Sequence, residues 1–224
     1  MAAPKRRNIS QRSEMIYDVH EFGISLDTRE LFIEPQDGDG EIGPVTANRF
    51  IKNLRILTSL GEENILIHMC APGGDWNYGI AIYDAINECN KNKAEITVLC
   101  HAHSRSMSSI IPQAAKWRVI MPTADFLIHN GTLEYDGNYT SAVREADWAK
   151  KQIEIMIDIY VNRCCEGAFW KRENMDKKAI KEWITKELDI RQEFYMTPRE
   201  AVDKGFMDAV LGDDEFENIE SLKS

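Results

Sequence analysis

The sequence predicts an α/β domain in which many strands pair in parallel. Two observations lead to this fold class: short apolar runs alternate with segments of helical periodicity, and no internal repeat or long low-complexity linker interrupts them. The length of 224 residues suits one domain with tails. Hydrophobic residues make up 43% of the chain and charged residues 29%, a balance typical of globular domains that bury a core.

The first predicted unit is a strand, a turn and a helix. Residues 64–69 (NILIHM) form a short apolar run and predict a buried strand. The turn at residues 71–75 (APGGD) follows directly. Apolar residues at helical spacing from Gly79 to Cys89 then predict a helix.

A second unit follows with the same alternation. Residues 94–100 predict the next strand, and residues 106–116 predict a helix that Pro112 must kink or shorten. Residues 117–121 and 125–129 predict two further short strands. Strands separated by helices favour parallel pairing, because each helix carries the chain back to the end of the sheet at which the previous strand began.

Two more helices are predicted, at about 140–165 and 175–187. The longer helix carries two apolar stripes: Ala142, Ala146, Ala149, Ile153, Met156, Ile157, Tyr160 and Cys164 form one, and Trp148, Ile155 and Ile159 form the other. A surface helix of a monomer needs one apolar face. The two stripes therefore indicate contact with a second body such as another subunit, or else a helix buried deep within one domain.

The two ends of the chain differ from the domain between them. Residues 1–20 are polar and basic and predict a flexible N-terminal arm, residues 21–211 form the domain, and residues 212–224 predict an exposed acidic tail. The arm has no apolar stretch of a secretory signal behind its basic residues, and no run approaches the ~20 residues of a membrane span. We therefore expect a cytoplasmic protein with no membrane partner.

Charge and cysteine content exclude further classes. The formal net charge of −10 argues against nucleic-acid binding, which normally uses a basic patch. The five cysteines, at positions 70, 89, 100, 164 and 165, are odd in number and match no zinc spacing. We expect them to be reduced, and most of them to serve as small buried hydrophobic residues.

Three segments between strands and helices carry residues capable of chemistry. The first is Pro72-Gly73-Gly74, which is either a plain tight turn or a place where backbone N–H groups face a ligand. The second contains Ser106, which is either a helix N-cap or a nucleophile with a nearby base. The third ends in His129, either a structural histidine or that base; His101 and His103 are competing bases, and His68 is expected to be structural.

Four separated blocks together resemble the Clp protease proteolytic subunit family, the ClpP-like serine peptidases. The blocks are MCAPGGDWNYGIAIYDAI, HSRSMSS, AKWRVIMPTADFLIHNG and DIRQEFYMTPREAVDKGFMDAV. Their order and rough spacing match the family from about residue 27 to 211. The resemblance implies a ClpP/crotonase-type superhelix of ββα units with a protruding handle helix at about 140–165.

The same resemblance implies a Ser–His–Asp catalytic triad. Ser106 would be the nucleophile, His129 the general base and Asp189 the residue that orients the imidazole. The backbone N–H groups of Gly74 and Met107 would form the oxyanion hole. Other acidic residues close to Asp189 in sequence are Glu187, Glu193 and Asp203.

Several positions depart from the family pattern without removing a triad member. Ala71 replaces a serine, Arg105 stands where a small residue usually precedes the nucleophile, and Ser108 and Ser109 replace small residues after Met107. Further departures are Ala102, Pro112 and Asn130-Gly131. A bulky cation beside the nucleophile would narrow the substrate groove, alter sequence preference or hinder closure.

The resemblance also implies an assembly and partners. Family members form homo-oligomers of stacked seven-membered rings, a tetradecamer, around a chamber that ATP-driven AAA+ unfoldases supply with unfolded protein or peptide substrates. The arm at 1–20 would be an axial-pore segment or a propeptide. No metal or organic cofactor is implied. The alternatives are an inactive structural or regulatory ring subunit, or an acyl-CoA enzyme of the crotonase type.

Overall fold

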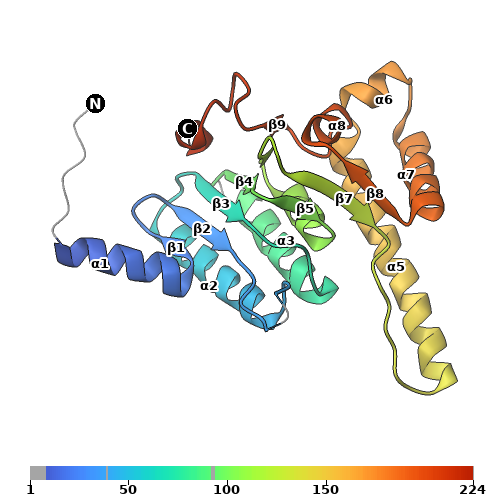
Figure 1. Ribbon diagram of the computed structural model, residues 1–224, viewed down its shortest axis with the longest axis horizontal. Helices are drawn as coiled ribbons and strands as arrows, with labels where there is room; N and C mark the ends of the chain where they lie inside the picture. The colour runs from blue at the N-terminus through green and yellow to red at the C-terminus, as the bar shows by residue number, and fades with distance from the viewer. Residues whose placement is uncertain (1–8, 39, 92–93, 224) are drawn as a thin grey trace.

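The computed structural model describes residues 9–38, 40–91 and 94–223, and it confirms the predicted α/β fold class (Figure 1). These residues form a six-stranded sheet, a three-stranded sheet and helices that pack around them. The alternation of strands and helices begins at residue 24 and continues to residue 210.

The larger sheet is parallel except at one edge. Its strands, in spatial order, are β1 (Ile24–Ser25), β2 (Glu30–Ile33), β3 (Ile65–Met69), β4 (Ile96–Cys100), β6 (Trp117–Ile120) and β9 (Ala209–Val210). Only β1 and β2 pair in antiparallel orientation within this sheet. Every residue of β3 and β4 is buried, because helices cover one face of the sheet and the C-terminal segment covers the other, and this explains their largely apolar sequences.

The smaller sheet carries the residues of greatest chemical interest. It contains β5 (His103–Arg105), β7 (Asp125–His129) and β8 (Glu193–Met196), with β7 in the middle. Strand β5 is parallel to β7, and β8 is antiparallel to it. The ends of β5 and β7 that lead to Ser106 and His129 therefore lie at the same edge of this sheet.

Helices account for most of the remaining residues. They are α1 (Ile9–Tyr17), α2 (Pro44–Leu60), α3 (Trp76–Lys91), α4 (Met107–Ile110), α5 (Tyr139–Cys164), α6 (Ala168–Arg172), α7 (Lys177–Arg191) and α8 (Pro198–Asp203). Shorter turns are η1 (Asp18–Phe22), η2 (Ile111–Ala114) and η3 (Ile219–Lys223). As predicted, Pro112 shortens its helix: α4 gives way to the 3₁₀ turn η2 at Ile111. No helix in the described part of the chain is long and apolar enough to cross a membrane.

Helix α5 extends away from the rest of the molecule (Figure 1). Its buried residues, Met156, Ile157, Tyr160, Val161 and Cys164, all lie in its C-terminal half. By contrast, Trp148 in the N-terminal half is 53% exposed, and Ile155, just before the first buried residue, is 48% exposed. The alternative of a helix buried along its whole length within one domain is therefore wrong.

Both ends of the described chain carry short helical segments. Residues 9–22 are helical, while the part of the predicted arm at residues 1–8 lies outside the described residues. The prediction of an exposed C-terminal tail is wrong for Phe216 and Leu222, which are buried against the larger sheet. Lys223 also forms an ion pair with Glu30 of β2, which holds η3 against the larger sheet.

A buried ion pair joins strand β6 to the segment directly before β9. Arg118 of β6 is 3% exposed, and its guanidinium donates to both carboxylate oxygens of Asp208 and to Gln113 Oε1. Gln113 in turn donates to the carbonyl oxygen of Phe206. This network links β6, η2 and the segment before β9, and each charged group has a partner that offsets its desolvation.

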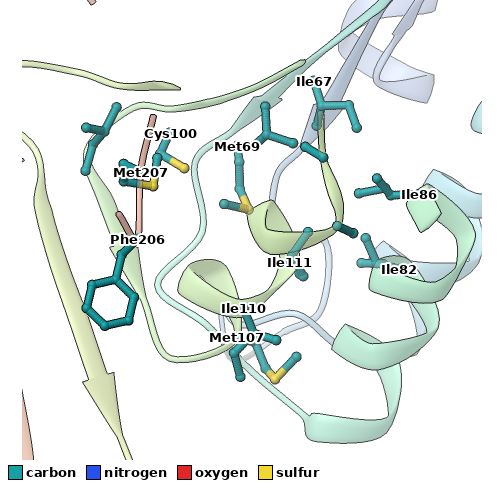
Figure 2. Close-up of a cluster of buried hydrophobic side chains, with 14 of the residues drawn as sticks. Ile67, Met69, Ile82, Ile86, Cys100, Met107, Ile110, Ile111, Phe206 and Met207 are labelled. Atoms are coloured by element: carbon teal, nitrogen blue, oxygen red, sulfur yellow. The ribbon is translucent and has the colours of Figure 1, made fainter. Parts of the chain in front are cut away.

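The short helix α4 packs against the hydrophobic core. Figure 2 shows Met107, Ile110 and Ile111 close to Ile82 and Ile86 of α3 and to residues of β3. A Cβ atom at Gly79 would lie 2.2 Å from Met107 Cε, so the Met107 side chain fills the space that the glycine leaves on α3. The position directly before α4, which is Ser106, is consequently held by a fully packed support.

Candidate active site

Ser106 occupies a strained turn between strand β5 and helix α4. Its backbone has φ 52° and ψ −128°, a conformation that a residue with a Cβ adopts at a cost of roughly 1–3 kcal/mol. Its N–H donates to the carbonyl oxygen of Leu127 at 3.2 Å, which ties the turn to β7. A sharp strand-to-helix turn of this kind presents a nucleophilic side chain at the edge of a sheet.

The Ser106 hydroxyl does not serve as a helix cap. Serine at an N-cap normally accepts a hydrogen bond from the first turn of the helix. The Ser106 side chain makes no such bond to α4, and the residue is half-buried. The structure therefore favours the chemical interpretation of this serine over the capping one.

The Pro72-Gly73-Gly74 segment lies against the Ser106 side chain. A Cβ atom at position 73, where φ is +135°, would lie 2.7 Å from Ser106 Cβ and 3.1 Å from Ser106 Oγ. At position 74, where φ is +148°, a Cβ atom would lie 2.4 Å from backbone atoms of Ile42. Both glycines are therefore required by close approach, which a plain tight turn would not explain.

Pairing with Ile42 sets the direction of the Gly74 N–H. Ile42 N–H donates to Gly73 O at 2.8 Å, and Asp75 N–H donates to Ile42 O at 2.9 Å. Because successive backbone groups of an extended chain point to opposite sides, the Gly74 N–H points away from Ile42. Met107 begins α4, so its N–H also lacks an acceptor within the helix.

His129 ends strand β7 beside the Ser106 turn. Arg105 pairs with Leu127, so Ser106 comes level with Ile128, the residue directly before His129. Neighbouring strands are about 4.8 Å apart, which brings the serine and the histidine into one neighbourhood. Burial lowers the pKa of His129, and the carboxylate of Glu193 acts in the opposite direction. The imidazole is thus favoured in its neutral form, the form that a general base needs.

The His129 side chain is close to the serine turn, but its Nε2 atom makes no hydrogen bond to the serine. Its Nε2 atom is buried and has no hydrogen-bond partner within the described residues, Ser106 Oγ included. An unpaired buried nitrogen costs roughly 1–3 kcal/mol. Catalytic hydrogen bonds are often long before substrate binds, so this geometry leaves the nitrogen available to a serine that moves toward it.

The other candidate bases are occupied elsewhere or lie further away. His101 Nε2 lies 3.0 Å from His68 Nδ1, and the His68 ring stacks on Phe32 at 4.8 Å between centroids. His103 begins β5, three residues before Ser106, which corresponds to about 10 Å along a strand. Of the histidines near the serine in sequence or space, His129 is the best placed.

The acidic residues near the fourth block fall into different surroundings. Asp189 is exposed on α7 and lines a surface pocket with Lys178, Lys181, Glu182, Thr185 and Lys186. Glu187 pairs with Arg191, and Asp203 pairs with Arg172. Glu193 begins β8 directly opposite His129. The strand ladder therefore brings Glu193 to the histidine, and it does not include Asp189.

Comparison with known proteins decides the family. The model of the Clp protease family matches residues 13–214, nearly the whole chain. The chain belongs to the Clp protease family. Proteins named ATP-dependent Clp protease proteolytic subunit are similar to it: one from Deinococcus radiodurans is 26% identical over 203 residues, which is 89% of this chain and 87% of the relative. One from Ligilactobacillus salivarius is 24% identical over 90% of this chain and 91% of the relative.

A solved structure supports the same fold. A ClpP1 variant from Listeria monocytogenes superposes with a TM-score of 0.66 at 22% identity, covering 88% of this chain and 96% of that one. The family resemblance predicted from the four sequence blocks is thus confirmed, and so is the ClpP-type fold.

Arg105, the most conspicuous departure from the Clp family pattern, is neutralised by its neighbours. Its Nε donates to Asp125 Oδ1 at 2.7 Å, and its second bond reaches Asp125 Oδ2. Its guanidinium also lies 5.6 Å from the ring centroid of Tyr195. The ion pair lowers the pKa of Asp125. Arg105 therefore lies along the face of the smaller sheet with its charge already matched.

The unusual serines after Met107 form supporting hydrogen bonds that the sequence alone did not indicate. Ser108 Oγ donates to Ala71 O at 2.6 Å and joins α4 to the glycine segment. Ser109 Oγ donates to Ser106 O at 2.7 Å and lies 2.6 Å from the Tyr160 hydroxyl of α5. Their only signal in the sequence was that polar residues stand where small ones are usual.

Most of the cysteines are buried thiols, as the sequence predicted. All five are unpaired, and Cys89, Cys100 and Cys164 are buried. Burial raises the pKa of Cys100 and of Cys164 to about 12 in each case, so both stay as thiols near neutral pH. In residues 9–38, 40–91 and 94–223, no group of three His, Cys, Asp or Glu side chains is arranged to hold a metal ion.

Proposed function

We propose that this chain is a serine endopeptidase that hydrolyses unfolded polypeptides in the cytoplasm. The observation that carries this proposal is the strained Ser106 turn, with Gly73 against the serine side chain and His129 at the end of the neighbouring strand. Membership of the Clp protease family supports the same reaction class.

In the proposed reaction, Ser106 Oγ attacks the carbonyl carbon of the scissile peptide bond. Its proton moves to His129 Nε2, and the negative charge that develops on the carbonyl oxygen is stabilised by the N–H groups of Gly74 and Met107. The imidazolium then gives its proton to the leaving amine, which leaves an acyl group on Ser106. A water molecule activated by His129 releases the acyl group and restores the hydroxyl.

We further propose that the chain works in a tetradecamer of two stacked seven-membered rings. The exposed apolar side chains of α5, among them Trp148 and Ile155, support a helix that meets another subunit. An enclosed chamber restricts cleavage to chains that are already unfolded. An AAA+ unfoldase would supply such chains, and the relatives similar to this chain are named as ATP-dependent.

A fluorophosphonate probe tests the reaction class directly. The expected result on the assembled particle is labelling at Ser106 that disappears in Ser106→Ala and His129→Ala. Ser59→Ala, at an exposed serine of α2, is the matched control and should label normally. An assembled wild-type particle that fails to label and fails to cleave a model peptide would overturn the proposal.

The second candidate is a ring subunit with little activity of its own. The unengaged His129 Nε2 is the observation that favours it, because a base that stays out of contact with the serine on substrate binding cannot take its proton. Peptidase assays of the homo-oligomer, alone and mixed with an active family member, separate the two functions. Activity only in the mixture would favour the second candidate. Binding of a CoA thioester would instead revive the acyl-CoA alternative.

A further inference from the structure

Glu193 is the first residue of β8 and the cross-strand neighbour of His129. The antiparallel ladder between β7 and β8 pairs Phe126 with Met196 and ends with His129 opposite Glu193. Cβ atoms of directly opposed residues lie about 4.5–5.5 Å apart and point to the same side of the sheet. A glutamate side chain is long enough to span that separation and reach an imidazole nitrogen.

The face on which Glu193 lies is the face of the serine turn. Along β8, Phe194 and Met196 are buried, while Glu193 and Tyr195 are exposed. Tyr195 stacks beneath the guanidinium of Arg105, the residue directly before Ser106. The Glu193 side chain therefore lies on the same face of the smaller sheet as the side chain of Arg105.

The backbone turn before β8 fixes the position of Glu193, the first residue of the strand. Gln192 has φ +61°, and its N–H donates to Leu188 O at 2.9 Å, so α7 closes and the chain turns sharply into the strand. Asp189 lies inside α7, before this turn, and is exposed among lysines. Asp189 therefore faces a lysine-lined pocket of α7, and it has no place in the ladder that pairs β8 with His129.

We propose that Glu193, and not Asp189, is the acidic residue that positions His129. This proposal rests on the proposed peptidase function and names the third member of its site. Glu193 accepts a hydrogen bond from Nδ1–H of His129, which leaves Nε2 unprotonated and directed toward Ser106. When Nε2 takes the serine proton, the carboxylate stabilises the imidazolium without becoming protonated itself.

The charged groups around β7 do not offer a rival partner. On β7 and β5, Asp125 and Arg105 pair with each other, and His103 begins β5 at the other end of the sheet. α4 contributes no titratable side chain. On α8, Arg199 pairs with Asp213, Glu200 caps its own helix and Asp203 pairs with Arg172. Glu193 is the carboxylate that acts on His129, and it raises the pKa that burial lowers.

Two matched amide substitutions test the assignment. In Glu193→Gln we expect kcat to fall about 10²–10⁴-fold with little change in KM, because the imidazole loses its orientation and charge partner. The midpoint of the pH profile of kcat/KM should also move to lower pH, since removing a nearby carboxylate disfavours imidazolium. Asp189→Asn should stay within about twofold of wild type in both measurements. The reverse pattern, or full activity in Glu193→Gln, would overturn the proposal.

A titration that needs no catalysis separates this inference from the peptidase proposal. In the Ser106→Ala particle, the His129 imidazole is followed by NMR of its C2–H, assigned by loss of the signal in His129→Asn. Adding Glu193→Gln should lower the pKa of His129, and adding Asp189→Asn should leave it unchanged. If Glu193→Gln lowers the pKa of His129 but the wild-type particle cleaves no peptide, the Glu193 contact is supported and the peptidase proposal fails. An unchanged pKa in both variants would overturn the contact.

Discussion

At the scale of single residues, the site depends on a strained serine that its surroundings hold in place. The φ of +52° at Ser106 is unfavourable for a residue with a side chain, and strain of this kind persists only where packing enforces it. The buried Met107 and the hydrogen bond of Ser109 to the Ser106 carbonyl supply that support. Gly73 completes it by leaving room beside the serine side chain.

Adding one methyl group beside the nucleophile should remove activity. In Gly73→Ala the new Cβ would press on Ser106 at 2.7 Å and would adopt φ +135°, so the loop must shift away from the serine. We expect kcat/KM on a model peptide to fall at least tenfold in a folded particle. Gly212→Ala is the control: its φ is +105° with no atom within 4 Å of the added Cβ, and its activity should stay close to wild type. Equal activity in the two variants would contradict the close approach.

Protonation of His129 should set the acid limb of the pH profile. A base must be neutral, and burial lowers the pKa of His129 below the ordinary histidine value of about 6.5. Activity should therefore be present near neutral pH and be lost as the pH falls through that lowered pKa. The measurement is kcat/KM against pH at constant ionic strength. A midpoint above about 6.5, in a particle that stays assembled, would count against His129 as the base.

At the scale of elements, the sequence predicted some segments well and others poorly for identifiable reasons. β7 was predicted with its observed bounds, Asp125–His129, because a buried strand with helices nearby is a continuous apolar run. β8 (Glu193–Met196) escaped notice because it has four residues and follows a helix after a single residue. The predicted end of α7 near residue 187 was too early, since Leu188 is also buried and the helix reaches Arg191.

The missed strand β8 also explains which site residues the sequence could indicate and which it could not. Ser106 and His129 stand in short blocks whose residue types carry their own signal, and the structure brings both to one edge of the smaller sheet. The acidic partner depends on strand register, which a single sequence does not specify when the strand itself is missed. Hydrogen bonds such as that between Ser109 and Tyr160 join residues 51 positions apart and have no local pattern.

The link from α5 to the serine turn predicts that a buried phenol supports catalysis. Tyr160→Phe removes the hydroxyl that lies 2.6 Å from Ser109 Oγ, so Ser109 loses one partner while keeping the Ser106 carbonyl. We expect a loss of about 1 kcal/mol in stability, seen as a lower Tm, and a several-fold fall in kcat. Tyr139→Phe, at a residue 83% exposed on the same helix, should change neither quantity. An unchanged kcat in Tyr160→Phe would show that the turn does not depend on α5.

At the scale of the whole molecule, the two halves of α5 have different environments. The C-terminal half packs into the core through Tyr160 and its buried neighbours, and the N-terminal half extends into solvent (Figure 1). Trp148, Ile155 and Ile159 lie on one side of this helix because they are spaced by seven and four residues. Covering such a stripe against a second copy would remove apolar surface from water, at roughly 25 cal/mol per Å².

Charge placed on that stripe should therefore divide the particle. In the double variant Trp148→Glu, Ile155→Glu, two carboxylates would have to be desolvated at the contact, so rings should separate while each subunit stays folded. We expect sedimentation velocity to give about half the wild-type mass, with an unchanged circular dichroism spectrum and lower peptidase activity. Lys150→Glu is the control: Lys150 is exposed and lies on the opposite side of the helix, so the assembly should persist. If the double variant keeps the wild-type mass, the stripe is not the surface that joins the proposed rings, and the contact must be sought on another part of the molecule.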